Sequence, residues 1–188
     1  LKIDYLFDRG QASIIASTTD SAADADERLG YYASYNVSDA WIAYFEGSHS
    51  SEDDEWLLGA SYTTTSGLNL TAEYFYNSSG IDDEIPEELI ELIDLADFIQ
   101  SVPNREAFSR EHYMLLQAYQ NDIFGKLDLL LRYTYNLDDH SRSLLGHLEL
   151  DLNDYASFFT SATLNSSGGG ELDSLREYWV QAGIELTF

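Results

Sequence analysis

The stretch that decides the fold is "YWVQAGIELTF", residues 178–188. Apolar residues occupy every second position, namely Tyr178, Val180, Ala182, Ile184, Leu186 and Phe188. The residues between them are mostly small or polar. Side chains of a β-strand point alternately to opposite faces, so the stretch predicts a strand with one apolar face and one polar face. The rest of the sequence has to tell which solvent meets the apolar face.

The same alternation recurs along the chain. It is clear in "LNLTAEYFYN" (68–77) and in "KLDLLLRYTYN" (126–136). A repeat of two residues is typical of strands that are apolar on one side. The pattern therefore predicts an all-β chain of about eleven strands, near residues 1–8, 11–18, 28–37, 40–48, 55–64, 68–77, 110–120, 126–136, 142–152, 155–165 and 177–188.

The segments between these runs alternate between short and long. The short ones lie near residue 9 and at 37–39, 65–67, 121–125 and 153–154. The long ones are expected at 18–27, 49–54, 78–109, 137–141 and 166–176. Outer-membrane barrels have short turns on the periplasmic side and longer loops outside, whereas a soluble β-meander has no reason to collect its long loops at one end.

Composition excludes several classes of function. The chain has 188 residues, a formal net charge of −25 and no cysteine. Nucleic-acid binding is excluded because phosphate contacts need Lys and Arg, and the lack of cysteine excludes a disulfide framework or a thiolate metal site. The sequence contains no run of about 20 apolar residues, the length that a membrane helix needs. The slightly polar mean hydropathy does not exclude membrane strands, which have about ten residues, half of them polar.

The charges of the predicted strands fall on the polar face. Arg or Lys on a lipid-facing strand surface costs about 2–4 kcal/mol at mid-depth, so this placement is what a membrane barrel requires. Most of the 34 acidic residues lie in or beside the long connectors. The candidate pore-lining residues are the charged residues of the polar face, Glu46, Glu73, Asp128, Arg132, Glu149, Asp151 and Glu185.

In these features the sequence resembles the C-terminal part of a Gram-negative, porin-like outer-membrane β-barrel. The resemblance rests on the terminal strand, the aromatic residues near strand ends and the loop asymmetry. It implies an antiparallel transmembrane up-and-down β-barrel in the bacterial outer membrane, in contact with lipid and lipopolysaccharide. In that family the barrel-assembly machinery reads the last strand. The positions that match are Tyr178, Ile184, Leu186 and Phe188.

Residues 1–188 are expected to form a single barrel domain. Bacterial single-chain barrels have an even number of strands, and an unpaired edge in lipid leaves backbone groups without partners. Eleven is odd, so we expect at least one strand to precede Leu1. The chain would then be the C-terminal part of a barrel of roughly 12–18 strands. The sequence leaves open whether the barrel forms a homotrimer and whether a partner protein fills it.

The segment 78–109 interrupts the β pattern. Pro86 suits the first position of a helix, and residues 86–101 then carry an apolar stripe with period 3.6. The opposite side is acidic, with Glu88, Glu91, Asp94 and Asp97. This helix either folds into the pore as a constriction loop or packs outside on neighbouring loops.

The predicted function is a channel for passive diffusion of small hydrophilic solutes or ions. Acidic side chains along the path would favour cations. Alternatively, the polar interior is filled by pairs such as Arg132 with Asp128 or Glu149. The other class of function is a non-conducting barrel that acts as a structural or assembly partner, or as a sheath for another protein. A soluble β-sandwich is the rival fold.

Catalytic and metal sites are weaker interpretations. "LDDHSR" (137–142) offers Asp138, Asp139, His140 and Ser141, but turn chemistry explains these residues. His147 is read as a hydrogen-bonding group of the polar face. The acidic stretches "DSAADADE" and "SSEDDE" lack the spacing and glycine of an EF-hand. The sequence therefore predicts no catalytic residue, no metal site and no cofactor.

Overall fold

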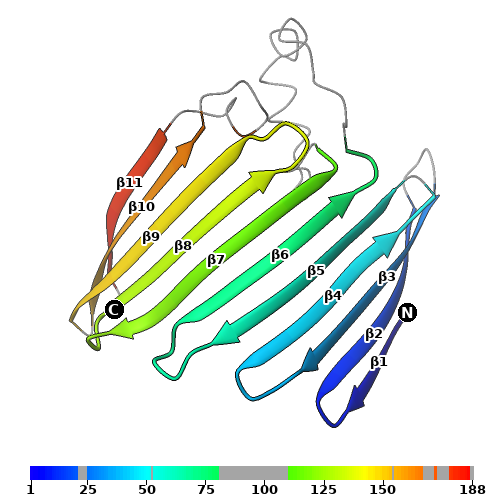
Figure 1. Cartoon of the computed structure of the whole chain (residues 1–188), viewed down its shortest axis with the longest axis horizontal. Coiled ribbons are helices and arrows are strands. Elements are labelled where there is room, and N and C mark those ends of the chain that lie inside the picture. The colour runs from blue at the N-terminus through cyan, green and yellow to red at the C-terminus, as the bar shows by residue number, and fades with distance from the viewer. Residues whose placement is uncertain are drawn as a thin grey trace, which may run out of the picture.

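The structure is a computed structural model that describes residues 1–20, 25–51, 53–80, 110–153, 155–166, 172 and 178–186. Eleven antiparallel strands form one sheet, and their order in the sheet is their order in the chain (Figure 1). The predicted all-β, up-and-down arrangement is confirmed. The strands are β1 (Lys2–Phe7), β2 (Gly10–Asp20), β3 (Ala25–Asn36), β4 (Trp41–His49), β5 (Asp54–Thr63), β6 (Asn69–Asn77), β7 (His112–Ile123), β8 (Leu127–Asn136), β9 (Arg142–Asn153), β10 (Ala156–Asn165) and β11 (Tyr178–Leu186).

The two outermost strands, β1 and β11, lie at opposite edges of the sheet (Figure 1). Within the described residues neither pairs with a further strand, so the sheet is open. The helix expected at 86–101 lies outside the described residues. Among the residues that are described, no helix is long and apolar enough to cross a membrane.

The connections define two ends of the sheet. The turn side carries the connections β1–β2, β3–β4, β5–β6, β7–β8 and β9–β10, and at the opposite end, the loop side, lie the strand ends that the other connections join. The long connectors predicted at 18–27 and 49–54 are wrong, because strands extend into both. In the first, Thr18 pairs with Glu27 and Asp20 with Ala25. Polar residues such as Ser and Thr are typical of loops, but they also fit a strand, because the hydrogen bonds of a β-ladder use only the backbone.

The second of these connections is a tight turn over residues 50–53. The backbone N–H of Ser50 donates to the carbonyl of Asp53 at 2.9 Å. The N–H of Asp53 donates to Ser50 Oγ at 3.1 Å. This connection is therefore as long as the turn at 37–40 and shorter than the one at 64–68. The expected alternation of lengths holds only for the later connections.

The register gathers the apolar positions onto one face. Phe45 pairs with Leu58, which pairs with Tyr74 on the next strand. The row continues through Met114 to Tyr135. Directly paired residues of antiparallel strands point to the same side of a sheet. The alternation of each strand therefore adds up to one apolar face and one polar face across the sheet.

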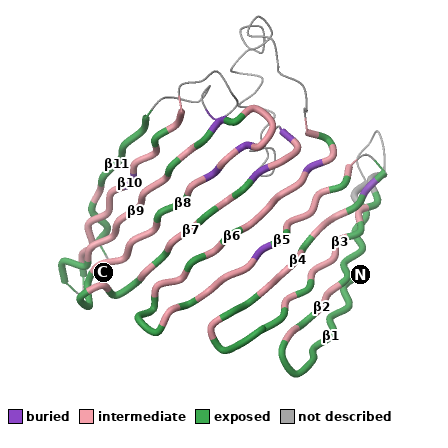
Figure 2. Tube along the Cα trace, viewed as in Figure 1, coloured by how far each residue is buried: buried purple, intermediate pink, exposed green. Residues whose placement is uncertain are grey.

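The apolar face is the exposed one. Leu58 is 55% exposed, Leu131 43% and Ile184 63%. On the polar face, Asn136 is 0% and Ser161 8% exposed. Figure 2 shows that buried residues are few and that the edge strands are mostly exposed. A soluble domain buries its apolar face, so the burial pattern of this sheet is inverted.

Aromatic residues mark both ends of the apolar face. On the loop side, the ring centroids of Trp56 and Tyr76 are 5.5 Å apart, and the ring of Phe45, from the middle of β4, lies 6.4 Å from that of Trp56. On the turn side, Trp41 and Tyr62 have centroids 4.8 Å apart. Along β5, Trp56 and Tyr62 are separated by about 20 Å at ~3.3 Å per residue. Aromatic residues flank the apolar band of membrane barrels in the same way.

Candidate functional site: the polar face of the sheet

The polar face brings the sequence-predicted charged residues to one side of the sheet. Directly paired residues of neighbouring strands point to the same side of the sheet. Each charged side chain therefore lies on the same face as its direct partner on the next strand. They do not form one cluster. Glu46 and Glu73 lie on β4 and β6, Arg132 lies alone in the middle of β8, and the others gather at the turn side of β8–β11.

We call the four turn-side carboxylates, Asp128, Glu149, Asp151 and Glu185, the acidic patch. Asp128 pairs directly with Glu149. Ser157 lies between the other two, as the partner of Asp151 on one side and of Glu185 on the other.

Like charges in directly opposed positions are unfavourable in a sheet. Ser157 Oγ donates to Glu149 Oε1 at 3.0 Å, and the backbone N–H of Asp122 donates to Asp128 Oδ1 at 2.9 Å. No ion pair between described residues includes a member of the acidic patch. The patch therefore concentrates four carboxylates on this part of the polar face.

Arg132 does not neutralise these carboxylates. Its Nε and Nη2 donate to Gln117 Oε1 at 3.0 and 2.7 Å. The expected pairing of Arg132 with Asp128 or Glu149 is therefore wrong. The reason is the register, which places Gln117 directly opposite Arg132.

Glu73 is held by a tyrosine from two strands away. The hydroxyl of Tyr44 donates to Glu73 Oε1 across the intervening strand β5. The ring crosses β5 at Gly59, where an added Cβ would collide with it. Glycine is required there because the ring occupies the space of a side chain. Tyr44 is not recognisable from the sequence, because its role depends on the register of three strands.

A cluster around Arg28 fixes the loop-side end of β3, β4 and β5. Its Nη2 donates to both carboxylate oxygens of Asp53, at 2.8 and 2.9 Å, and its Nη1 donates to Ser48 Oγ at 2.9 Å. Glu55 lies 3.5 Å from Nη1. The stretch "SSEDDE" predicts an acidic loop, but nothing in it indicates that a guanidinium binds its Asp53. Asp53 thus serves to anchor the 50–53 turn.

A hollow of about 560 Å³ lies mainly on the polar face, next to Arg28. Charged residues, Glu46 and Glu55, line it together with an apolar group formed by Leu57, Phe75 and Leu115. The apolar residues depart from the predicted polar pattern. A surface of this mixed kind can contact both the charged and the apolar parts of a solute.

The candidate catalytic residues of the stretch 137–142 make hydrogen bonds to neighbouring segments at the loop side of the sheet. Asp138 Oδ2 accepts the backbone N–H groups of Glu111 and His112, both at 2.9 Å. His140 Nδ1 lies 2.9 Å from the hydroxyl of Tyr135. Ser141 Oγ accepts the N–H of Leu172 at 3.3 Å. His140 and Ser141 thus have separate partners.

One hydroxyl–imidazole pair is present on the polar face. His147 Nδ1 lies 2.7 Å from Ser161 Oγ. A catalytic base of this type is oriented by a third group. Glu149, the nearest candidate along β9, instead accepts from Ser157. The pair therefore acts as a hydrogen-bonded link between β9 and β10. In the part of the chain that is described, His, Asp and Glu residues form no group suited to a metal ion.

The remaining predicted residues lie outside the described residues or on the apolar face of the sheet. Glu88, Glu91, Asp94 and Asp97 lie outside the described residues, as does Phe188. The other three positions of the assembly signal are on β11, where their side chains are 57–68% exposed on the apolar face: Tyr178, Ile184 and Leu186.

Comparisons with known proteins add a distant structural likeness. No family model matches the chain, and no curated protein matches it. The fold is similar to a solved structure described as the NanC porin, with 13% sequence identity and a TM-score of 0.49. The match covers 100% of this chain and 91% of that chain. It does not identify a family.

Proposed function

We propose that the sheet is the wall of a transmembrane β-barrel in a bacterial outer membrane, and that the barrel is a channel for small hydrophilic solutes or ions. The observation that carries the proposal is the inverted burial of the sheet. Large apolar side chains on one face stay exposed, as Leu58 does at 55% and Leu131 at 43%. In lipid such a face contacts hydrocarbon, and the polar face meets the water inside the barrel.

The polarity of the sheet makes a soluble sandwich a poorer explanation. A sandwich would cover the apolar face with a second sheet. All eleven strands belong to one sheet, and no second sheet is present in the described ranges. A single layer with water on both sides would leave this whole face exposed to water. Each Å² of exposed apolar surface costs about 25 cal/mol of free energy.

Closure of the proposed barrel depends on the edge strands. Backbone groups of an open edge are costly in lipid because no water can bind them. With eleven strands in antiparallel order, β1 and β11 run in the same direction. Antiparallel closure therefore needs an odd number of further strands between these two edges.

The acidic patch supports a preference for cations. On the polar face, carboxylates outnumber the guanidinium and ammonium groups, and Arg28 is already bound by Asp53 and Glu55. Rings of acidic side chains favour cations in pores. The effect falls with ionic strength, because salt at 0.1 M screens charges beyond about 10 Å.

Conductance of the natural full-length chain in planar bilayers tests this proposal. We expect discrete channels whose reversal potential in a KCl gradient shows cation preference. Asp128→Asn combined with Glu149→Gln should reduce that preference. Asp39→Asn, which removes an exposed carboxylate in a turn, should have little effect. Absence of conductance would favour a non-conducting barrel with a partner protein, and anion preference would contradict the role of the acidic patch.

A further inference from the structure

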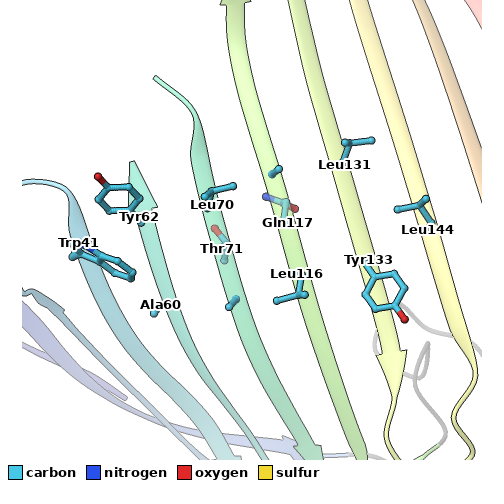
Figure 3. Close-up of a pocket in the computed structure, with 12 residues that line it drawn as sticks. Trp41, Ala60, Tyr62, Leu70, Thr71, Leu116, Gln117, Leu131, Tyr133 and Leu144 are labelled. Carbon is cyan, nitrogen blue, oxygen red and sulfur yellow. The ribbon is translucent and has the colours of Figure 1, made fainter. Parts of the chain in front are cut away.

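A groove crosses the apolar face from β4 to β9 (Figure 3). Its volume is about 530 Å³, within the range of roughly 300–1,000 Å³ that small-ligand sites occupy. Trp41 and Tyr62 stand at one end, and Leu131, Tyr133 and Leu144 at the other (Figure 3). The groove is a separate feature from the polar-face hollow.

Three alanines explain why the face is hollowed here. Ala60 on β5 and Ala72 on β6 are cross-strand partners, and Ala118 on the next strand, β7, pairs with Leu70 of β6. A methyl group next to leucine and aromatic side chains leaves a depression. On the same row as Ala118, Leu131 restores the full height of the face.

The inference about what fills the groove rests on the proposed membrane location. Water is a poor occupant, because a bound water needs two to four polar partners and this groove is lined mainly by carbon atoms. An empty groove would lose the dispersion contacts of its lining. In a membrane the occupant must therefore be apolar, which leaves a lipid chain or another protein surface.

We propose that the groove holds one acyl chain of a membrane phospholipid, with the headgroup beside Trp41 and Tyr62. A volume of about 530 Å³ is that of a site for one small ligand, whereas a stable contact with a second copy buries about 800 Å² on each partner, much more than this groove offers. The Trp41–Tyr62 pair lies at the turn side, and aromatic residues of this type gather at the level of lipid headgroups.

Filling the groove tests the proposal. Ala118→Phe would place a ring in it, and Ala72→Phe is a second variant at a neighbouring position. Ala33→Phe is the matched control, because Ala33 is an exposed alanine of the same face on β3, outside the groove. The full-length proteins are inserted into vesicles of dipalmitoyl phosphatidylethanolamine, extracted in detergent and weighed by native mass spectrometry.

We expect the wild type and Ala33→Phe to retain one phospholipid per chain, and both groove variants to lose at least tenfold of that occupancy. Equal retention in all four proteins, or none in the wild type, would overturn the acyl-chain site. A dimer that Ala118→Phe abolishes would identify a second copy as the occupant and overturn it too. Flotation with the vesicles is measured first, since failure to float would refute the membrane location itself.

Discussion

The substitution Leu131→Arg tests the assignment of the two faces most directly. Leu131 lies in the middle of β8, on the apolar face, with 43% of its surface exposed. Its neighbour Leu130 is the same residue type on the same strand, but points to the polar face, where its partners are Tyr119 and His147. Leu130→Arg is therefore a matched control that differs only in the face it changes.

The size of the effect follows from the depth of the residue. Arginine near the middle of a lipid-facing strand destabilises a membrane barrel by about 2–4 kcal/mol. At 1.4 kcal/mol per tenfold change, the folding equilibrium of Leu131→Arg should fall roughly 30- to 700-fold. On the polar face the guanidinium meets water and carboxylates, so Leu130→Arg should change stability by less than about 1 kcal/mol.

Urea unfolding of the full-length protein in vesicles, followed by tryptophan fluorescence, measures both variants. The wild type and each variant are compared at equal lipid-to-protein ratio. Equal losses in the two variants would refute the assignment of the faces. A larger loss for Leu130→Arg would mean that the face we place in water is the one in contact with lipid.

Three further predictions concern packing, the loop-side cluster and the pore. Gly59→Ala should lower stability by about 1–3 kcal/mol, because the new Cβ displaces the Tyr44 ring. Gly146→Ala is the control and should be nearly neutral, because the atom nearest to its new Cβ is 3.5 Å away. Thermal unfolding compares the two variants, and equal losses of stability would contradict the packing of this ring. Arg28→Gln should cost about 1.5–3 kcal/mol through lost charged hydrogen bonds and speed proteolysis of the adjoining turn; unchanged cleavage would show that the cluster does not hold it. Deletion of 84–101 should raise conductance and weaken cation preference together if this segment constricts the pore, and unchanged single-channel records would reject that role.

The sequence alone determined the strands and their two faces. Alternation such as that of "KLDLLLRYTYN" depends only on the period of a strand, which is local and independent of the partner. The prediction that Glu73 and Asp128 share a face followed from the same rule, because the side of each residue within its strand is set by parity. Boundaries were weaker where strands are polar, as at Asp20 and Ala25.

Only the tertiary structure decided which side chains meet across strands. The pairing of Arg132 with Gln117 rather than with a carboxylate depends on register, and a shift of one residue changes every partner. The reach of Tyr44 over Gly59 involves three strands, so no single stretch of sequence contains it. The groove over Ala118 likewise appears only when neighbouring strands align. Local periodicity fixes the faces of a sheet, whereas its sites arise from contacts between residues far apart in the chain.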